Sequence, residues 1–251
     1  MMINFEVHKK VYLIGAGPGD PELLTIKAVN ALKKANAVLY DRLISKEILE
    51  YAPKNAAMIY VGKKKGNHSL PQEEICNLLI QLASKNPYVV RLKGGDPFIF
   101  GRGGEEYEAV TSMGLNCEVI PGITAAMGAA ASLGLSLTHR DHSSEVVLLT
   151  GHKQIGKNMT NYPDFSKLIL KNKTHIIYMG LSQVESIAKD ILTNNSGMEN
   201  FPAMIVENAT LPNQRTIIGT ISNIYNKAIE AKAVSPALVI LGEVIRNFPV
   251  L

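Results

Sequence analysis

The residues with the greatest chemical potential lie in one stretch, RLKGGDPFIFGRGGEE, which runs from Arg91 to Glu106. It combines five glycines with three cations and several carboxylates. Gly94 and Gly95 permit close main-chain approaches, and they follow an apolar run that is typical of a short strand. Loops that follow strands often bind ligands. The same composition also suits a structural connector between a strand and a helix.

Two other charged groups follow predicted strands. Asp41 and Arg42 come directly after the apolar residues 37–40, and Lys63 to Lys65 come after residues 57–61. The Asp41–Arg42 pair fits a solvated turn with a salt bridge as well as a functional site. The lysines fit either ordinary surface charge or a loop that binds anionic substrate groups.

Two further patterns are weak evidence for a binding site, one for a dinucleotide and one for a metal. The turn GAGPG at residues 15–19 lacks the second half of a dinucleotide fingerprint, and Pro18 cannot donate a main-chain hydrogen bond to a phosphate. The segment 139–142 holds two histidines and an aspartate without a further His or Cys partner, so we predict no metal site. Cys76 and Cys117 are far apart in sequence, which favours free thiols in a reducing compartment.

Composition narrows the class of protein. The chain of 251 residues is 46% hydrophobic and 19% charged, which suits one large domain or two modest ones. A net charge of +4 favours an acidic small molecule over nucleic acid, and no aromatic stacking platform is evident. The N-terminus MMINFEVHKK lacks the apolar core of a signal peptide. Residues 119–138 are uncharged but rich in glycine and alanine, so we expect a buried helix, no membrane partner and a cytoplasmic protein.

The elements that must position these residues alternate along the chain. Strands are predicted in the first half at residues 10–14, 37–40, 57–61, 88–92 and 116–120, and in the second half at 145–150, 175–179, 203–207, 215–219 and 237–241. The later strands are close enough for antiparallel pairing. We therefore predict an α/β fold with two α/β domains, residues 1–137 and 138–251, and a cofactor cleft between them.

Several motifs together are more specific than any single glycine turn. In order they are GAGPGDPELLT, YDRLIS, VGKK, PQEEI, RLKGGDPFIFGRGGEE, VIPGITAA, LTHRDHSS with TGH, and SPALVILGEV. From about residue 11 to residue 244, this series closely resembles the tetrapyrrole methylase family, whose fold is of the class III methyltransferase type. YDRL, VGKK and the central stretch favour the members that act on uroporphyrinogen III.

The resemblance implies methylation of uroporphyrinogen III at C-2 and C-7 by S-adenosylmethionine, which becomes S-adenosylhomocysteine. The product would be precorrin-2, formed by way of precorrin-1, for siroheme or cobalamin synthesis. A homodimer is also implied. The alternatives are another tetrapyrrole methylase of cobalamin synthesis and a non-catalytic protein that binds the cofactor or a tetrapyrrole.

The resemblance also implies roles for individual residues. Asp41 would be the proton acceptor and Lys63 the proton donor. The cofactor positions are mostly small residues: Pro18, Gly94, Gly95, Asp96, Ile99, Thr124, Ala125, Met179, Ala209 and Ala237. Our own assignment adds four cations that would neutralise substrate carboxylates, namely Arg42, Lys93, Arg102 and Arg140.

Overall fold

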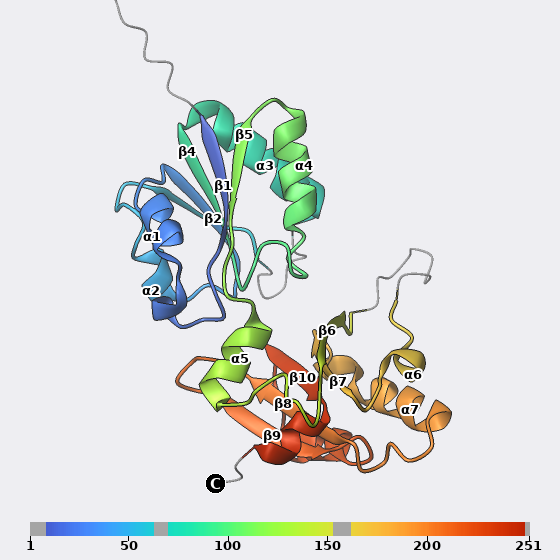
Figure 1. The fold of residues 1–251 in the computed structure, drawn as a ribbon. Helices are drawn as coiled ribbons and strands as arrows, with labels where there is room; N and C mark the ends of the chain where they lie inside the picture. The colour runs from blue at the N-terminus through green and yellow to red at the C-terminus, as the bar shows by residue number, and fades with distance from the viewer. Residues whose placement is uncertain (1–8, 63–69, 153–161, 249–251) are drawn as a thin grey trace, which may run out of the picture. The chain divides into compact units, whose positions relative to one another are not determined.

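The computed structural model describes residues 9–62, 70–152 and 162–248, which form two compact units. Each unit contains one five-stranded sheet, and the predicted α/β class is confirmed (Figure 1). The units divide between Thr124 and Ala125, whereas the sequence analysis placed the boundary between residues 137 and 138. The difference arises because the alanine-rich helix α5 (Ala125–Leu133) buries Ala126 and Ala129 in the core of the second unit.

The sheet of the first unit is entirely parallel, in the order β3-β2-β4-β1-β5. Its strands are β1 (Lys10–Gly15), β2 (Ala37–Tyr40), β3 (Ala57–Tyr60), β4 (Tyr88–Lys93) and β5 (Asn116–Ile120). All five predicted strands are present within a residue or so at each end. The interior strands are rich in Val, Ile and Leu because both faces of a parallel sheet are covered.

Helices cover both faces of this sheet (Figure 1). The elements are η1 (Pro21–Leu23), α1 (Ile26–Leu32), α2 (Lys46–Leu49), α3 (Gln72–Lys85) and α4 (Gly103–Ser112). One core cluster packs α1 and α2 against residues such as Val90 and Leu92, and the other packs α3 and α4 against residues such as Val89. Successive strand residues point to opposite faces, so alternate residues of β4 face the α3–α4 side.

The chain reverses its winding direction at the adjacent strands β1 and β4. The helix after β1 lies on one face of the sheet and the helix after β4 lies on the other. A crevice at the carboxyl ends of the strands is expected at such a switch point, and ligands bind there in open α/β sheets. The two glycine-rich stretches that were singled out in the sequence begin at this point.

The second unit has a mixed sheet in the order β6-β7-β10-β8-β9. Its strands are β6 (Glu145–Thr150), β7 (Lys173–Tyr178), β8 (Pro202–Glu207), β9 (Arg215–Thr220) and β10 (Ala237–Leu241). β6 and β7 are parallel, while β10 is antiparallel to both β7 and β8, and β8 is antiparallel to β9. The predicted antiparallel pairing of the later strands is therefore confirmed.

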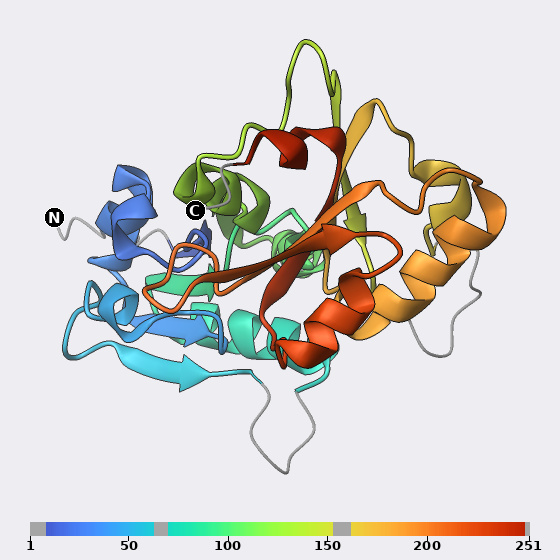
Figure 2. The same ribbon diagram turned by 90° about the horizontal axis from the view of Figure 1, so that it is seen from below.

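Helices also cover the second sheet on both faces. They are α5, α6 (Phe165–Leu168), η3 (Leu181–Gln183), α7 (Val184–Asn194), α8 (Ile224–Glu230) and η4 (Glu243–Asn247). One core cluster joins α5 and η4 to the sheet, and the other joins α6, α7 and α8 to its opposite face. In Figure 2 the orange helices α6 and α7 lie side by side. No helix among the described residues has the length and apolar character needed to cross a bilayer.

Candidate active site

The loops after β1 and β4 are joined by main-chain hydrogen bonds. The N–H of Gly17 donates to the carbonyl of Gly95 at 3.1 Å, and the N–H of Gly95 donates to the carbonyl of Gly17 at 2.7 Å. The N–H of Ala16 also donates to the carbonyl of Lys93 at 2.8 Å. Two loops that are far apart in sequence thus form one structure. It brings together the predicted cofactor residues of the loops after β1 and β4, namely Pro18, Gly94, Gly95, Asp96 and Ile99.

A third loop, which follows β5, joins this structure through Asp96. The Oδ2 atom of Asp96 accepts from the N–H of Gly122 at 3.1 Å, and Oδ1 accepts from the N–H of Phe98 at 2.8 Å. A Cβ atom on Gly122 would lie 2.3 Å from the carbonyl oxygen of Gly95 and 2.7 Å from the carbonyl carbon of Gly15. Only glycines permit three strand ends to converge this closely. Asp96 therefore positions the loops, whatever else it contacts.

Four of the remaining predicted cofactor residues, Ala125, Met179, Ala209 and Ala237, lie at the same end of the second sheet. The register places Ala237 beside Glu207, at the carboxyl end of β8, and the next residue, Leu238, beside Tyr178, at the carboxyl end of β7. Met179 directly follows Tyr178, and Ala209 lies two residues after Glu207. The hydroxyl of Tyr178 also accepts from the N–H of Ala126 at 3.1 Å, which ties Ala125 and the start of α5 to the same edge. Thr124 is the last residue of the first unit.

Backbone strain is concentrated in these loops. Among the residues that the structure describes, six non-glycine residues have positive φ. Five of them lie in the central stretch 91–106, at Met179 or next to Ala209: Phe100, Arg102, Met179, Asn208 and Thr210. Such conformations each cost energy and persist where the surroundings impose them, commonly at ligand sites. The strain is therefore independent support for a functional role of these loops.

Asp41, the predicted proton acceptor, follows β2 and lies beside β4. Its Oδ1 atom accepts from the N–H of Leu43 at 3.1 Å, and its Oδ2 atom lies 3.5 Å from Nη2 of Arg91. The Asp41 side chain is 26% exposed, whereas that of Arg91 is 5% exposed. A half-buried carboxylate that is oriented by two donors and still reaches solvent can accept a proton. Lys63, the predicted proton donor, lies outside the described residues.

A buried carboxylate, that of Glu106 on α4, holds the other end of Arg91. Its Oε1 atom accepts from Nε of Arg91 at 3.1 Å and from Nε2 of Gln72 at 3.1 Å. Nζ of Lys93 donates to Oε1 at 3.0 Å and lies 2.9 Å from Oε2. Glu106 is fully buried. Two cations and two carboxylates, including Asp41, thus form a charge-balanced network.

Lys93 belongs to this network and is not available to a substrate carboxylate at its observed position. The residue is 4% exposed, because β4 directs residues 91 and 93 to the same buried face. Burial, and then the charge of Arg91, lower the pKa of Lys93, and Glu106 offsets only part of that shift. We therefore move Lys93 from the predicted substrate-binding set to the buried network.

The other three predicted substrate cations are exposed. Arg102 makes a bidentate ion pair with Glu105, with distances of 2.8 and 2.7 Å. Arg42 follows Asp41, and Arg140 lies in a turn closed by main-chain bonds between His139 and Ser143. Substrate contacts for these three arginines remain predictions. Among the described residues, no cluster of His, Cys, Asp and Glu has a metal-binding arrangement.

A second buried carboxylate, Glu207, supports the edge of the second sheet. It pairs with Arg215 and accepts from the N–H of Val234. Arg215 also donates to the carbonyl of Lys232 at 3.0 Å. Burial opposes ionisation of Glu207, but Arg215 and the Val234 N–H outweigh it and lower the pKa of Glu207. The loop before Ala237 is thus tied to the end of β8.

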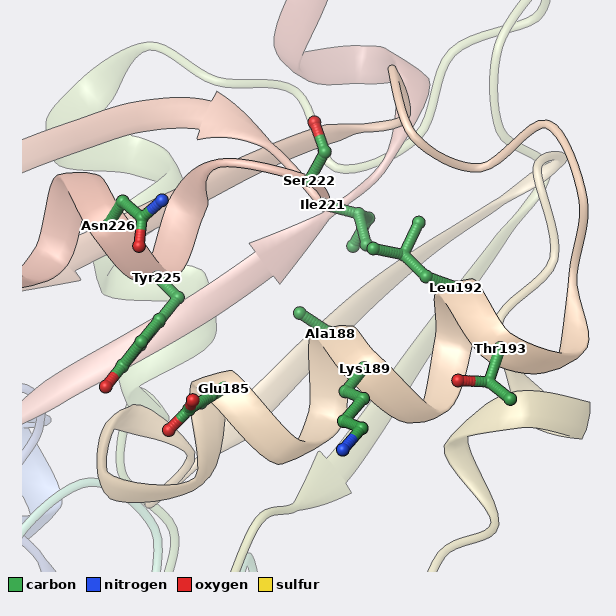
Figure 3. Close-up of a pocket in the computed structure, with 9 residues that line it drawn as sticks. All are labelled: Glu185, Ala188, Lys189, Leu192, Thr193, Ile221, Ser222, Tyr225 and Asn226. Carbon is green, nitrogen blue, oxygen red and sulfur yellow. The ribbon is translucent and has the colours of Figure 1, made fainter.

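A shallow cavity of about 360 Å³ lies between α7 and α8, away from these residues (Figure 3). Its lining includes Ala188 and Leu192 from α7 and Tyr225 from α8. None of the predicted catalytic or cofactor residues that the structure describes lines it. The candidate site is therefore the set of loops at the strand ends, not this cavity.

The chain is similar to known proteins along most of its length. The family model of tetrapyrrole (corrin/porphyrin) methylases matches residues 10–225, which contain the loops after β1, β4 and β5. The chain belongs to the tetrapyrrole methylase family. The uroporphyrinogen-III C-methyltransferase of Methanocaldococcus jannaschii is 46% identical over 236 residues, which are 94% of this chain and 96% of that protein.

Some relatives are longer than this chain and others are of similar length. A siroheme synthase of Acinetobacter baylyi is 46% identical over 94% of this chain but only 51% of its own length. This chain thus spans about half of the siroheme synthases that it matches. A Thermus thermophilus uroporphyrin-III C-methyl transferase, solved with S-adenyl homocysteine, has a TM-score of 0.79 and 39% identity. That match covers 95% of this chain and 94% of the other.

The residues present in this tetrapyrrole methylase fit S-adenosylmethionine. In the first unit, Gly94 leaves the main chain open to close approach, and a Cβ atom there would lie 2.8 Å from Leu43. In the second unit, the apolar side chain of Met179 is half-exposed. Main-chain donors and acceptors beside apolar surface suit a nucleoside with an amino-acid arm. Pro18, Ile99 and the glycines of the first unit stay predicted cofactor contacts, as do the predicted residues of the second unit, each unit being considered by itself.

Sequence reasoning missed three residues that support the site: Glu106, Tyr178 and Glu207. A signal for Glu106 was present, because Arg91 and Lys93 lie two apart in a strand whose other residues are apolar. Two cations on one buried face of a sheet require a carboxylate. No comparable sequence signal identifies Tyr178 or Glu207, since their contacts depend on tertiary structure.

Proposed function

We propose that the chain transfers methyl groups from S-adenosylmethionine to C-2 and C-7 of uroporphyrinogen III, giving precorrin-2 by way of precorrin-1. The observation that carries this proposal is the interlocked pair of loops after β1 and β4, with Asp41 at the neighbouring strand end. The similarity to the M. jannaschii methyltransferase along nearly its whole length supports the same substrate. The product would serve siroheme or cobalamin synthesis.

S-adenosylmethionine, when bound, supplies an electrophilic methyl group. The chain's own residues orient the reactants, which supplies most of the acceleration of a transfer between two bound molecules. The methylated pyrrole must then lose a proton, and Asp41 accepts it or stabilises the positive charge of the ring. Lys63 donates a proton in the same proposal. Arg42, Arg102 and Arg140 neutralise substrate carboxylates.

The products of one assay distinguish the proposed function from a later tetrapyrrole methylase and from a non-catalytic binding protein. Purified protein is incubated without oxygen with S-adenosylmethionine and either uroporphyrinogen III or precorrin-2, and the products are identified by mass spectrometry. We expect two methyl groups to be added to uroporphyrinogen III. Methylation of precorrin-2 alone would indicate a later step of cobalamin synthesis. Cofactor binding without any methylated product would indicate a non-catalytic protein.

We also propose that the chain forms a homodimer and acts in the cytoplasm. Two free cysteines are compatible with a reducing compartment. Sedimentation equilibrium measures the oligomeric state directly. A mass equal to one chain at micromolar concentration would contradict the dimer.

A further inference from the structure

Glu106 makes its described hydrogen bonds and ion pairs with Gln72, Arg91 and Lys93. It is fully buried on α4, and its carboxylate meets two cations and an amide. Burying a carboxylate together with two cations is costly unless the geometry is well satisfied. A fold that needed only packing at this place would be served by apolar side chains.

Arg91 connects Glu106 to Asp41. Its guanidinium is planar and rigid, so fixing one edge fixes the others. Nε is held by Glu106 at 3.1 Å, Nη1 donates to the carbonyl of Leu92 at 3.0 Å, and Nη2 faces Asp41 at 3.5 Å. Only the Asp41 end of this chain of contacts reaches solvent appreciably, with 26% exposure against 5% for Arg91 and none for Glu106.

We infer that Glu106 is a positioning residue that, through Arg91, holds the Asp41 carboxylate in the orientation needed to receive a proton. The inference rests on the proposed function. Lys93 balances the second negative charge, so that the network is neutral when Asp41 is ionised. Gln72 completes the hydrogen bonding of Oε1 without adding charge.

The test compares three variants of the full chain. Glu106→Gln keeps the shape but removes the negative charge, so the contact with Arg91 is no longer an ion pair. Glu106→Asp keeps the charge but withdraws the carboxylate by one methylene. Gln72→Met is the matched control, since it removes a neutral donor from the same Oε1 atom and leaves every ion pair in place.

The measurements are kcat and KM for both substrates, the dissociation constant for S-adenosylmethionine, and the melting temperature, with all kinetics below the melting transition. We expect Glu106→Gln to lower kcat about 10- to 100-fold with dissociation constant and KM nearly unchanged, because a displaced catalytic group costs rate rather than binding. Glu106→Asp should lower kcat by a smaller factor than Glu106→Gln does, but by more than about threefold. Gln72→Met should keep kcat within about twofold, even if its melting temperature falls.

Each outcome decides the inference. It is overturned if both Glu106 variants retain wild-type kcat, or if Gln72→Met loses as much kcat as they do, since the network would then act only on stability. If Glu106→Gln does not fold, the comparison of kcat between Glu106→Asp and Gln72→Met decides the inference. The proposed function fails separately, when wild-type protein that is folded and binds S-adenosylmethionine yields no methylated uroporphyrinogen.

Discussion

The convergence of three strand ends predicts a severe effect of one methyl group. In Gly122→Ala the new Cβ would lie 2.3 Å from the carbonyl oxygen of Gly95, and 2.7 and 2.8 Å from two main-chain atoms of Gly15. Ordinary van der Waals contact begins at about 3.4 Å, so the closest pair of atoms must separate by about 1 Å. All three neighbours are main-chain atoms, and no flexible side chain can rotate away.

The energy follows from that displacement. Overpacking a core costs about 1–3 kcal/mol, and main-chain neighbours place this variant at the upper end, near 3 kcal/mol. For a chain of this size, each kcal/mol lowers the melting temperature by about 2–4 °C, so we expect a fall of about 6–12 °C. Shifted loops should also lose at least one hydrogen bond to S-adenosylmethionine, which is worth about 1 kcal/mol, so its dissociation constant should rise roughly fivefold.

The assay is calorimetry, scanning for stability and titration for cofactor affinity. Gly104→Ala is the control, because a Cβ there meets nothing within 4 Å and alanine favours the helix by about 1 kcal/mol. We expect the control to match or exceed the wild type in melting temperature and to bind S-adenosylmethionine normally. If Gly122→Ala behaves like the control, the loops are not locked together as described.

Three further predictions follow from the site and its surroundings. Asp41→Asn should fold and bind S-adenosylmethionine but lose turnover by about 100-fold or more, and equal turnover would remove Asp41 from proton transfer. The pKa of Glu207 is lowered from its ordinary value of 4.5. Its ionisation therefore stabilises the fold above that value and ceases to do so as the pH falls through the folded pKa. The deficit in melting temperature of Glu207→Gln should accordingly be larger at pH 7 than at pH 4, and a deficit independent of pH would contradict the ion pair. Burial, and then the charge of Glu106, raise the pKa of Cys117 to about 12, so iodoacetamide at pH 8 should label it much more slowly in native than in unfolded protein, judged by peptide mass spectrometry.

Much of the first unit could be predicted from local sequence. Residues 37–40 form β2 as predicted, because a short apolar run between polar segments has few alternatives in an α/β chain. The glycines after β1 and β4 indicate two loops, and the structure joins them. Their joining by the Gly17–Gly95 hydrogen bonds required knowledge of the strand order, which no local pattern contains.

The domain boundary and the buried charges show where local reasoning ends. An alanine-rich helix carries no mark of the sheet on which it packs, so α5 was assigned to the wrong side of the boundary. The sequence alone predicts Lys93 as one of the cations that neutralise substrate carboxylates. It is the last residue of β4, and the alternation of the strand directs it to Glu106.

The most direct test of the proposed reaction uses S-adenosylmethionine labelled with carbon-13 in its methyl group. Uroporphyrinogen III is converted without oxygen, and the product is examined by mass spectrometry and carbon-13 NMR. We predict two labelled methyl groups, at C-2 and C-7, with a singly labelled species that appears first and then declines. Label at other positions, or no labelled tetrapyrrole from folded protein that binds S-adenosylmethionine, would contradict the proposal.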